Sequence, residues 1–217
     1  MRPVTVTVGP LATADADGVA ASQSVSGAAA VTLDGALVTS GVAIMDLPRR
    51  IIITSAGDDT GITFTITGTT FAGSVTTDVV TGANNAAASS VVDFKTVTRI
   101  VTSGSTAADI TVGTNGVAGT EWVRFDPWAP PEVSIQANVT GTVNYTLQQT
   151  LDDPNSPTDS VAVRSVVWVS SNDTAVVAAT ATQQSNYAFT PIYARVLLNS
   201  GTGSVTTRFV QSGAAAL

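Results

Sequence analysis

Alternation with a period of two recurs along almost the whole chain and limits the folds that are open to it. Residues 4–8 place valine on one side of an extended chain and threonine on the other. Residues 62–67 repeat this pattern with isoleucine and phenylalanine facing threonine. No segment sustains the apolar spacing of three and four residues that an amphipathic helix requires. The sequence therefore predicts an all-β protein with less than about 10% helix.

The predicted strands follow one another at short intervals, and most are bounded by turns of glycine, asparagine or aspartate. We expect strands at residues 36–45, 49–55, 61–68, 74–81, 91–102, 107–113, 132–140, 142–150, 161–170, 174–180, 191–199 and 203–211. Many short strands at this spacing, with one wet and one apolar face, are typical of antiparallel β-sandwiches.

Three prolines between residues 127 and 131 interrupt this series of strands. Proline cannot donate to a strand ladder, and closely spaced prolines favour a stiff, extended connector. The sequence therefore predicts an N-terminal arm at residues 1–30, a first β domain at 31–126 and a second at 132–217, the domains being immunoglobulin-like or jelly-roll-like sandwiches. A single extended sandwich with a corner at the prolines is the alternative.

The predicted arm consists mostly of small side chains, which bury too little area to offset the entropy of ordering the chain. Its one strand-like stretch contains Val4, Val6 and Val8. We expect this stretch to add a strand to a neighbouring subunit, so that the three valines lie at an interface.

The three tryptophans have different sequence environments. Trp168 stands in an apolar run and is predicted to belong to the core. Trp128 stands among prolines and is predicted to be exposed for a contact with a partner. A sugar-binding groove lined by these residues and Trp122 is the alternative.

The residue types that carry most enzyme chemistry are scarce. The chain has no histidine, no cysteine, one lysine and two glutamates. General acid–base catalysis, covalent catalysis and transition-metal binding draw mainly on these residues, so we expect no enzyme activity, no cofactor and no metal site. The net charge of −7 argues against a nucleic-acid partner. No stretch approaches about 20 apolar residues, so no membrane partner is expected either.

Two kinds of loop resemble ligand-binding loops in composition, but they lack the sequence pattern that such loops require. The acidic pairs at residues 58–59 and 152–153, the second followed by Asn155, could offer oxygen ligands to Ca²⁺. Neither has the Asp-x-Asp-x-Asp-Gly spacing, so both are interpreted as solvated turns. The glycine-rich stretches at 113–116 and 201–203 precede no helix, so they are predicted to be hairpin turns rather than phosphate loops.

Several stretches taken together carry a likeness to a known group. They are RIIITSAGDD (50–59) leading into GITFTITG (61–68), FKTVTRI (94–100), DITVG (109–113) and SGTGSVTTRFVQSG (200–213). This set resembles virion structural proteins of tailed bacteriophages, particularly of the short-tailed type.

The resemblance implies a particle component that is made in the host cytoplasm and located in the virion. The expected role is that of a capsid decoration or cement protein, which forms a homo-oligomer, with a trimer favoured, and contacts the major capsid protein or other virion proteins. A neck or tail component, such as an adaptor, tube or fibre-base protein, is one alternative. A module that binds host glycans is another.

Overall fold

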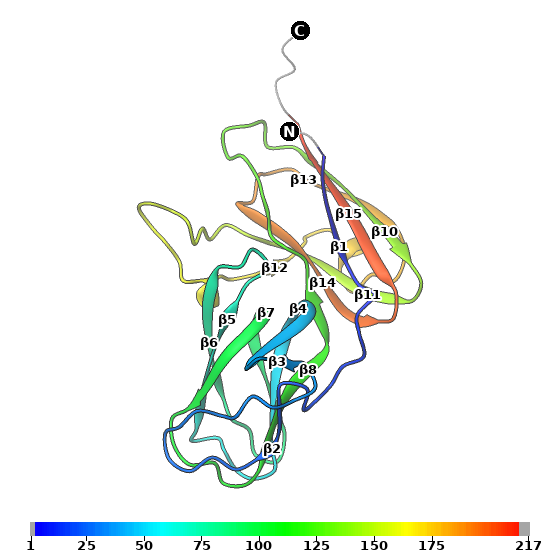
Figure 1. Cartoon of the computed structure of the whole chain (residues 1–217). Coiled ribbons are helices and arrows are strands. Elements are labelled where there is room, and N and C mark those ends of the chain that lie inside the picture. Colours follow the sequence, from blue (N-terminus) through cyan, green and yellow to red (C-terminus); the bar gives the residue numbers. More distant parts are fainter. Residues whose placement is uncertain (1–2, 213–217) are drawn as a thin grey trace. The chain divides into compact units, whose positions relative to one another are not determined.

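The computed structural model describes residues 3–212 and confirms the predicted fold class. Strands make up 53% of the chain and helix 3%, and the sheets are antiparallel. The chain forms two compact units, one of residues 12–115 and the other of residues 1–11 together with 116–217 (Figure 1). Within the described part, no helix has the length and apolar character needed to cross a membrane.

This division differs from the predicted one. The prolines at 127–131 lie in a loop inside one unit, and the chain passes from one unit to the other within a single strand, between Asn115 and Gly116. Residues 12–30, predicted to be part of an arm, belong to the first of the two units and contribute a strand to its sheet. Proline marks a break in a ladder, and here that break is a loop and not a domain boundary.

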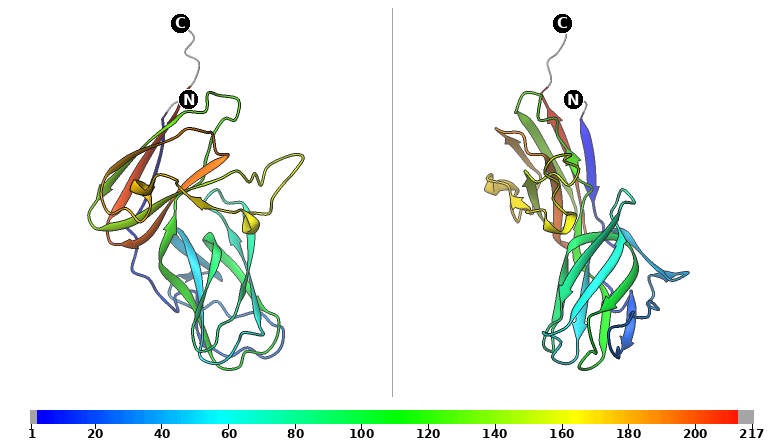
Figure 2. Two further views of the ribbon diagram at one scale, coloured as in Figure 1. Left: turned by 180° about the vertical axis from the view of Figure 1, so that it is seen from behind. Right: turned by 90° about the vertical axis from the view of Figure 1, so that its left-hand side faces the viewer.

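The unit of residues 12–115 is a strongly curved antiparallel sheet (Figure 2). Its strands are β2 (Ala20–Gln23), β3 (Val38–Thr39), β4 (Val42–Ser55), β5 (Thr63–Thr69), β6 (Val75–Thr81), β7 (Ala87–Thr102) and the first part of β8 (Ile110–Gly119). They are ordered β8-β4-β7-β5-β6, with β2 beside β8 and β3 beside β4. Alternate apolar residues such as Ile53, Phe64, Ile66 and Ile100 are fully buried, as the period of two predicts.

An aspartate side chain joins β6, the last strand of this order, to β7. Asp78 is 3% exposed. Its Oδ2 accepts hydrogen bonds from the backbone N–H groups of Val91 and Val92 in β7, at 2.7 and 3.1 Å, and its Oδ1 accepts one from Val79 at 2.8 Å. The carboxylate therefore satisfies backbone donors of β7.

A buried guanidinium fixes the beginning of this unit to β4. Arg49 is 2% exposed and forms a two-pronged ion pair with Asp46, with Nε–Oδ1 and Nη2–Oδ2 distances of 2.7 and 2.8 Å. The same ion pair binds both the N–H and the carbonyl group of Ala12. The Ala12 N–H donates to Asp46 Oδ2 at 2.7 Å, and Arg49 Nη2 donates to the Ala12 carbonyl at 2.6 Å. We call these three residues the Arg49 clamp.

The second unit is a sandwich of two antiparallel layers. Its strands are β1 (Val4–Val8), the end of β8, β9 (Val123–Arg124), β10 (Val133–Thr140), β11 (Val143–Thr150), β12 (Val169–Ser170), β13 (Gln183–Tyr187), β14 (Tyr193–Gly201) and β15 (Ser204–Gln211). One layer has the order β1-β15-β10-β13, and the other has β12-β11-β14 with β8 and β9 beside β14. Tyr145, Phe125 and Phe209 fill the space between the layers.

β1 finds its partner within the chain. It pairs antiparallel with β15, with Val4 opposite Phe209 and Val8 opposite Val205. Val6 and Val8 are buried and Val4 is half-buried. In this structure β15 of the same chain thus supplies the ladder that the sequence led us to expect from a neighbouring subunit.

Two strand predictions in this unit, at residues 161–170 and 174–180, were largely wrong, and two strands, β9 and β13, were missed. Residues 161–168 form a loop with the 3₁₀ turn η1 (Val163–Ser165), and residues 174–180 contain the 3₁₀ turn η2 (Thr174–Val176). In both segments an aspartate side chain accepts a hydrogen bond from a backbone N–H group that could otherwise pair with another strand. Asp152 accepts from Val167, and Asp173 accepts from Ala175. Of the missed strands, β9 has only two residues, and β13 reads QQSNY and has no apolar alternation.

The Arg49 clamp generates a prediction about acid stability. Burial alone would raise the pKa of Asp46, but hydrogen bonds from Arg49 and from the N–H groups of Ala12 and Leu47 outweigh it and hold the pKa below 3.8. A lowered pKa stabilises the fold above the unfolded-state pKa, and this contribution is lost as the pH falls through the folded-state pKa. Asp46→Asn should therefore cost about 3 kcal/mol of unfolding free energy at pH 7, because it leaves Arg49 buried without its counter-ion.

The measurement is urea unfolding of wild type and Asp46→Asn between pH 7 and pH 2. The difference between the two proteins should stay constant down to about pH 5 and shrink below about pH 4. Asp58→Asn is the matched control, since Asp58 contacts Thr60 and no arginine is among its partners. A difference that is the same at all pH values would contradict the role of the ionised carboxylate.

Candidate functional site

Trp128 has the most exposed large apolar side chain of the described residues, with 95% of its surface free. It lies in a turn at residues 126–129, which we call the Trp128 turn. The Trp128 N–H donates to Asp126 Oδ1 at 2.9 Å, and the Ala129 N–H donates to the Asp126 carbonyl at 3.2 Å. Trp128 is thus exposed, as the sequence predicted.

The base of this turn is anchored to the end of β15. The side chain of Gln211 accepts from the Asp126 N–H at 3.0 Å and donates to the Asp126 carbonyl at 2.8 Å. Gln211 itself is 1% exposed. The exposed indole is therefore carried by a backbone that is held on both its donor and its acceptor side.

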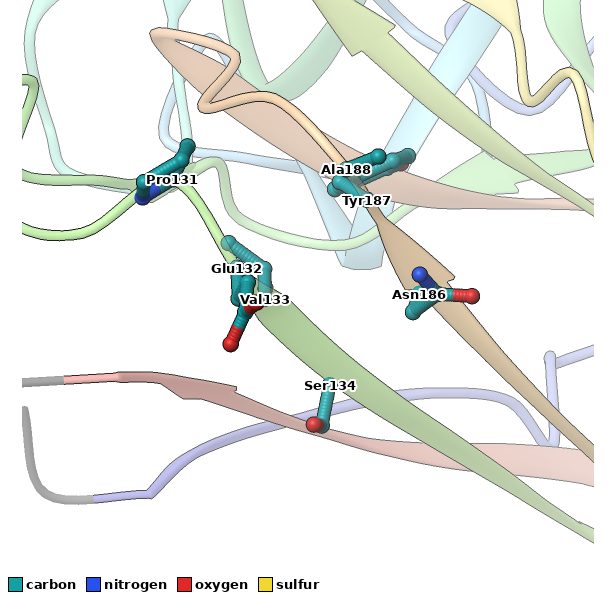
Figure 3. A pocket seen from close by; sticks show the side chains of 7 residues that line it. All are labelled: Pro131, Glu132, Val133, Ser134, Asn186, Tyr187 and Ala188. Carbon is teal, nitrogen blue, oxygen red and sulfur yellow. The ribbon is translucent and has the colours of Figure 1, made fainter.

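The same unit has a hollow of about 310 Å³, whose lining residues are shown in Figure 3. It is lined by Pro131, Glu132, Val133, Ser134, Asn186, Tyr187 and Ala188, from the beginning of β10 and the end of β13. We call it the Glu132 hollow. The Glu132 carbonyl accepts from the N–H of Ser212 at 3.0 Å, while the adjacent Gln211 holds the Trp128 turn. The consecutive residues Gln211 and Ser212 thus contact the Trp128 turn and the lining of the Glu132 hollow, respectively.

Tyr187 forms the apolar part of the Glu132 hollow and links it to the core. Its ring packs edge-on against Phe125 at 6.4 Å and tilted against the part-exposed Phe189 at 5.8 Å. Burial raises the pKa of the Tyr187 hydroxyl, so this group stays neutral. Glu132 is the ionisable side chain that remains in the lining for contact with a ligand.

These features suit a contact surface. The exposed indole, the part-exposed Phe189 and the hollow with its carboxylate, amide and hydroxyl groups combine an aromatic anchor with polar groups. Protein interfaces concentrate binding energy in such aromatic residues, and their rims are polar. The lining residues include no thiol or imidazole that could act as a nucleophile or base.

The other two tryptophans lie together on the outward face of the β11–β14 layer. Trp122 contacts Trp168 at 5.0 Å and Tyr193 at 5.6 Å, both edge to face. The guanidinium of Arg195, which is 3% exposed, stacks over Trp168 at 4.3 Å, and that of Arg124 lies 5.7 Å from the Tyr193 ring. We call these five residues the aromatic cluster. Trp168, predicted to be core, is half-buried in it.

The aromatic cluster fastens the long loop that follows β11. The Tyr193 hydroxyl donates to Asp153 Oδ1 at 3.3 Å and accepts from Asn155 Nδ2 at 2.9 Å, and Arg124 Nη2 pairs with Asp153 Oδ2 at 2.9 Å. The acidic stretch that could have been a Ca²⁺ site is therefore joined to an arginine and a tyrosine. Within residues 3–212, no group of three or more acidic, histidine or cysteine side chains is placed to hold a metal ion.

The remaining candidate loops have structural roles as well. Asp58 accepts from the hydroxyl and the N–H of Thr60, and these hydrogen bonds lower its pKa. Asp59 is fully buried and accepts from the Ala107 N–H at 2.7 Å. Residues 201–203 turn between β14 and β15, as predicted. Residues 113–116 do not form the predicted hairpin turn and lie inside β8. Gly113 has no side chain there, which allows the backbone of Asp15 and Ala16 to pack directly against the strand.

Sequence reasoning missed Arg124, Tyr193 and Arg195. Alternation could have found them, because residues two apart share a face of a strand. Trp122 with Arg124, and Tyr193 with Arg195, are such pairs. What the pattern could not show is that Tyr193 lies opposite Arg124.

Comparisons with protein-family models, with curated proteins and with solved structures find no match to this chain.

The aromatic cluster generates a prediction about the loop of residues 151–160. Tyr193→Phe keeps the ring in place but removes the bonds to Asp153 and Asn155, so the loop should be cleaved faster in limited proteolysis. The global unfolding free energy should fall by only about 1 kcal/mol. Tyr145→Phe is the matched control, because its hydroxyl donates to the Ala181 carbonyl, outside this loop. Equal cleavage of the loop in both variants would contradict the fastening role.

Proposed function

We propose that this protein is a non-enzymatic structural component of a tailed-bacteriophage virion, and that it acts as a capsid decoration or cement protein. The observation that carries the proposal is the Trp128 turn. A tryptophan that is 95% exposed adds nothing to the core of its own chain, yet its N–H is bound by Asp126, whose own backbone is held by Gln211. Such rigid presentation lowers the entropy lost when the indole is buried by a partner.

The sheet surface supports the same role. Val75 and Val91 are 76% and 56% exposed, and the outward positions of β5 are occupied by threonine. Charged residues form 12% of the sequence. Contacts made by such faces would depend little on salt, since few of them would rest on exposed ion pairs.

In this role the protein forms a homo-oligomer, with a trimer favoured, and contacts the major capsid protein. Symmetry repeats each weak contact in every subunit, so a modest patch around Trp128 gains avidity from the number of copies. The protein is made in the host cytoplasm and becomes part of the virion.

A neck or tail component is the alternative within the same class, and copy number separates the two. Quantifying this protein against the major capsid protein in purified particles should give hundreds of copies for a decoration protein. About six to a few dozen copies would place it in the neck or tail.

Glycan binding is the second candidate, favoured by the exposed indole and by Glu132, Ser134 and Asn186 in the nearby hollow. Aromatic faces and convergent polar groups are what sugar sites use. Binding of the purified protein to a glycan array, lost on Trp128→Ala, would favour this function over the structural one.

The proposal predicts a specific effect of Trp128→Ala. Binding of the purified protein to particles that lack it should weaken by about 30-fold, the loss of about 2 kcal/mol expected for an interface anchor. The unfolding free energy should change by less than about 0.5 kcal/mol, because the side chain is exposed. Phe71→Ala is the control, since Phe71 is 49% exposed in the other unit. Unchanged binding by Trp128→Ala would show that the indole is not the anchor of the contact with the capsid.

A further inference from the structure

β1 is the part of its unit that is most separable from the rest. It is an end strand of its sheet and pairs with β15 alone among the described strands, so removing it leaves the ladders of β15, β10 and β13 intact. Residues 12–115, which form the other unit, separate β1 from the remainder of its own unit in the sequence. The strand is thus attached by backbone pairing on one side and by a short connector.

The position of β1 beside β15 has to be filled. Val6 and Val8 are 3% and 0% exposed, and they lie opposite Thr207 and Val205, which are fully buried. Without β1 this side of the core would face water, and the donors and acceptors of β15 on that side would lose their partners. Any stable copy of the unit therefore contains a strand there, but nothing in these contacts requires the strand to come from the same chain.

The connector between β1 and the other unit is short. It comprises residues 9–11, after which the Arg49 clamp holds Ala12 on both its N–H and its carbonyl. Three extended residues span at most about 11 Å. A strand donated to a second copy would therefore bring the two copies into direct contact.

Within the strand itself, the outer edge of β1 carries no charged residue, proline or bulge, and prolines stand only outside it, at Pro3 and Pro10. Its described residues are alternating valine and threonine, with Thr5 and Thr7 exposed and no charged side chain between Val4 and Val8. Natural edge strands usually carry lysine, proline or a bulge to prevent pairing with another chain. The composition of β1 fits a strand that lies at a junction between copies.

We propose that copies of this protein exchange β1, so that β1 of one copy pairs with β15 of the next in the same register. Exchange preserves every contact that β1 makes with β15. It also adds contacts between the two copies, because the short connector holds them close together. Strand exchange is therefore a low-cost route to an oligomer. This inference rests on the homo-oligomer in the proposed function. It names the strand that joins the copies.

Cysteine pairing tests the exchange directly, because the chain contains no cysteine of its own. Thr7 lies opposite Thr206, and their hydroxyl oxygens are 3.1 Å apart, close enough for a disulfide between cysteines at these positions. Full-length Thr7→Cys and Thr206→Cys are mixed in urea, refolded together and oxidised. If β1 is exchanged, the mixture should give covalent dimers that contain one copy of each variant.

The control is the mixture of Thr5→Cys with Thr206→Cys. Thr5 lies opposite Arg208, so it is on the same exposed side of β1 but one diagonal, about 7–8 Å, from position 206. That distance exceeds the reach of a disulfide. The in-register mixture should therefore give about tenfold more mixed dimer than the control, and equal yields would indicate random collision and count against the exchange.

The double variant Thr7→Cys/Thr206→Cys decides the remaining case. Exchange predicts covalent dimers and larger species on a non-reducing gel. A purely monomeric product with a disulfide inside each chain would overturn the proposal, and so would a failure to form any disulfide. Because the assay uses purified protein alone, its failure would leave the particle-binding test of Trp128→Ala unaffected.

Discussion

The unit of residues 12–115 depends on the neutralisation of one buried guanidinium. Arg49 is 2% exposed in a sheet whose core is largely aliphatic and aromatic, and a buried charge is costly unless it is paired and hydrogen-bonded. Asp46 supplies the opposite charge, and the backbone carbonyls of Ala12 and Asn115 accept further hydrogen bonds from Arg49. Ala12 is the first residue of this unit. Its position is therefore defined by the same hydrogen bonds that stabilise the buried Arg49.

Aspartate has a common use throughout the structure. Asp78 accepts from β7, Asp126 holds the Trp128 turn, and Asp152 and Asp173 take donors from the loops after β11. In each case a carboxylate accepts hydrogen bonds from backbone N–H groups. Acidic residues that could be suspected of metal binding or catalysis in a chain without histidine thus act as local supports for an irregular β fold.

The sequence predicted those parts of the structure that depend on local alternation. The burial of Phe64 and Ile66 and most strands of the first unit follow from the period of two. β13 escaped notice because its polar residues do not alternate. The exposure of Trp128 could be predicted from its prolines, whereas the aromatic cluster depends on which strands become neighbours. The partner of β1 was beyond local reasoning, since Thr7 and Thr206 are 199 positions apart.

The separation of β1 from β15 also has a consequence for the newly made chain. At about 5–20 residues per second, a ribosome releases β15 roughly 10–40 s after β1. During this interval the residues of the other unit, which lie between the two strands in the sequence, can already fold, while β1 has no strand of its own chain to pair with. When several ribosomes translate one messenger RNA, their nascent chains lie close together, and each carries an unpaired β1. Synthesis itself would then bring a free β1 near the completed β15 of the chain ahead of it.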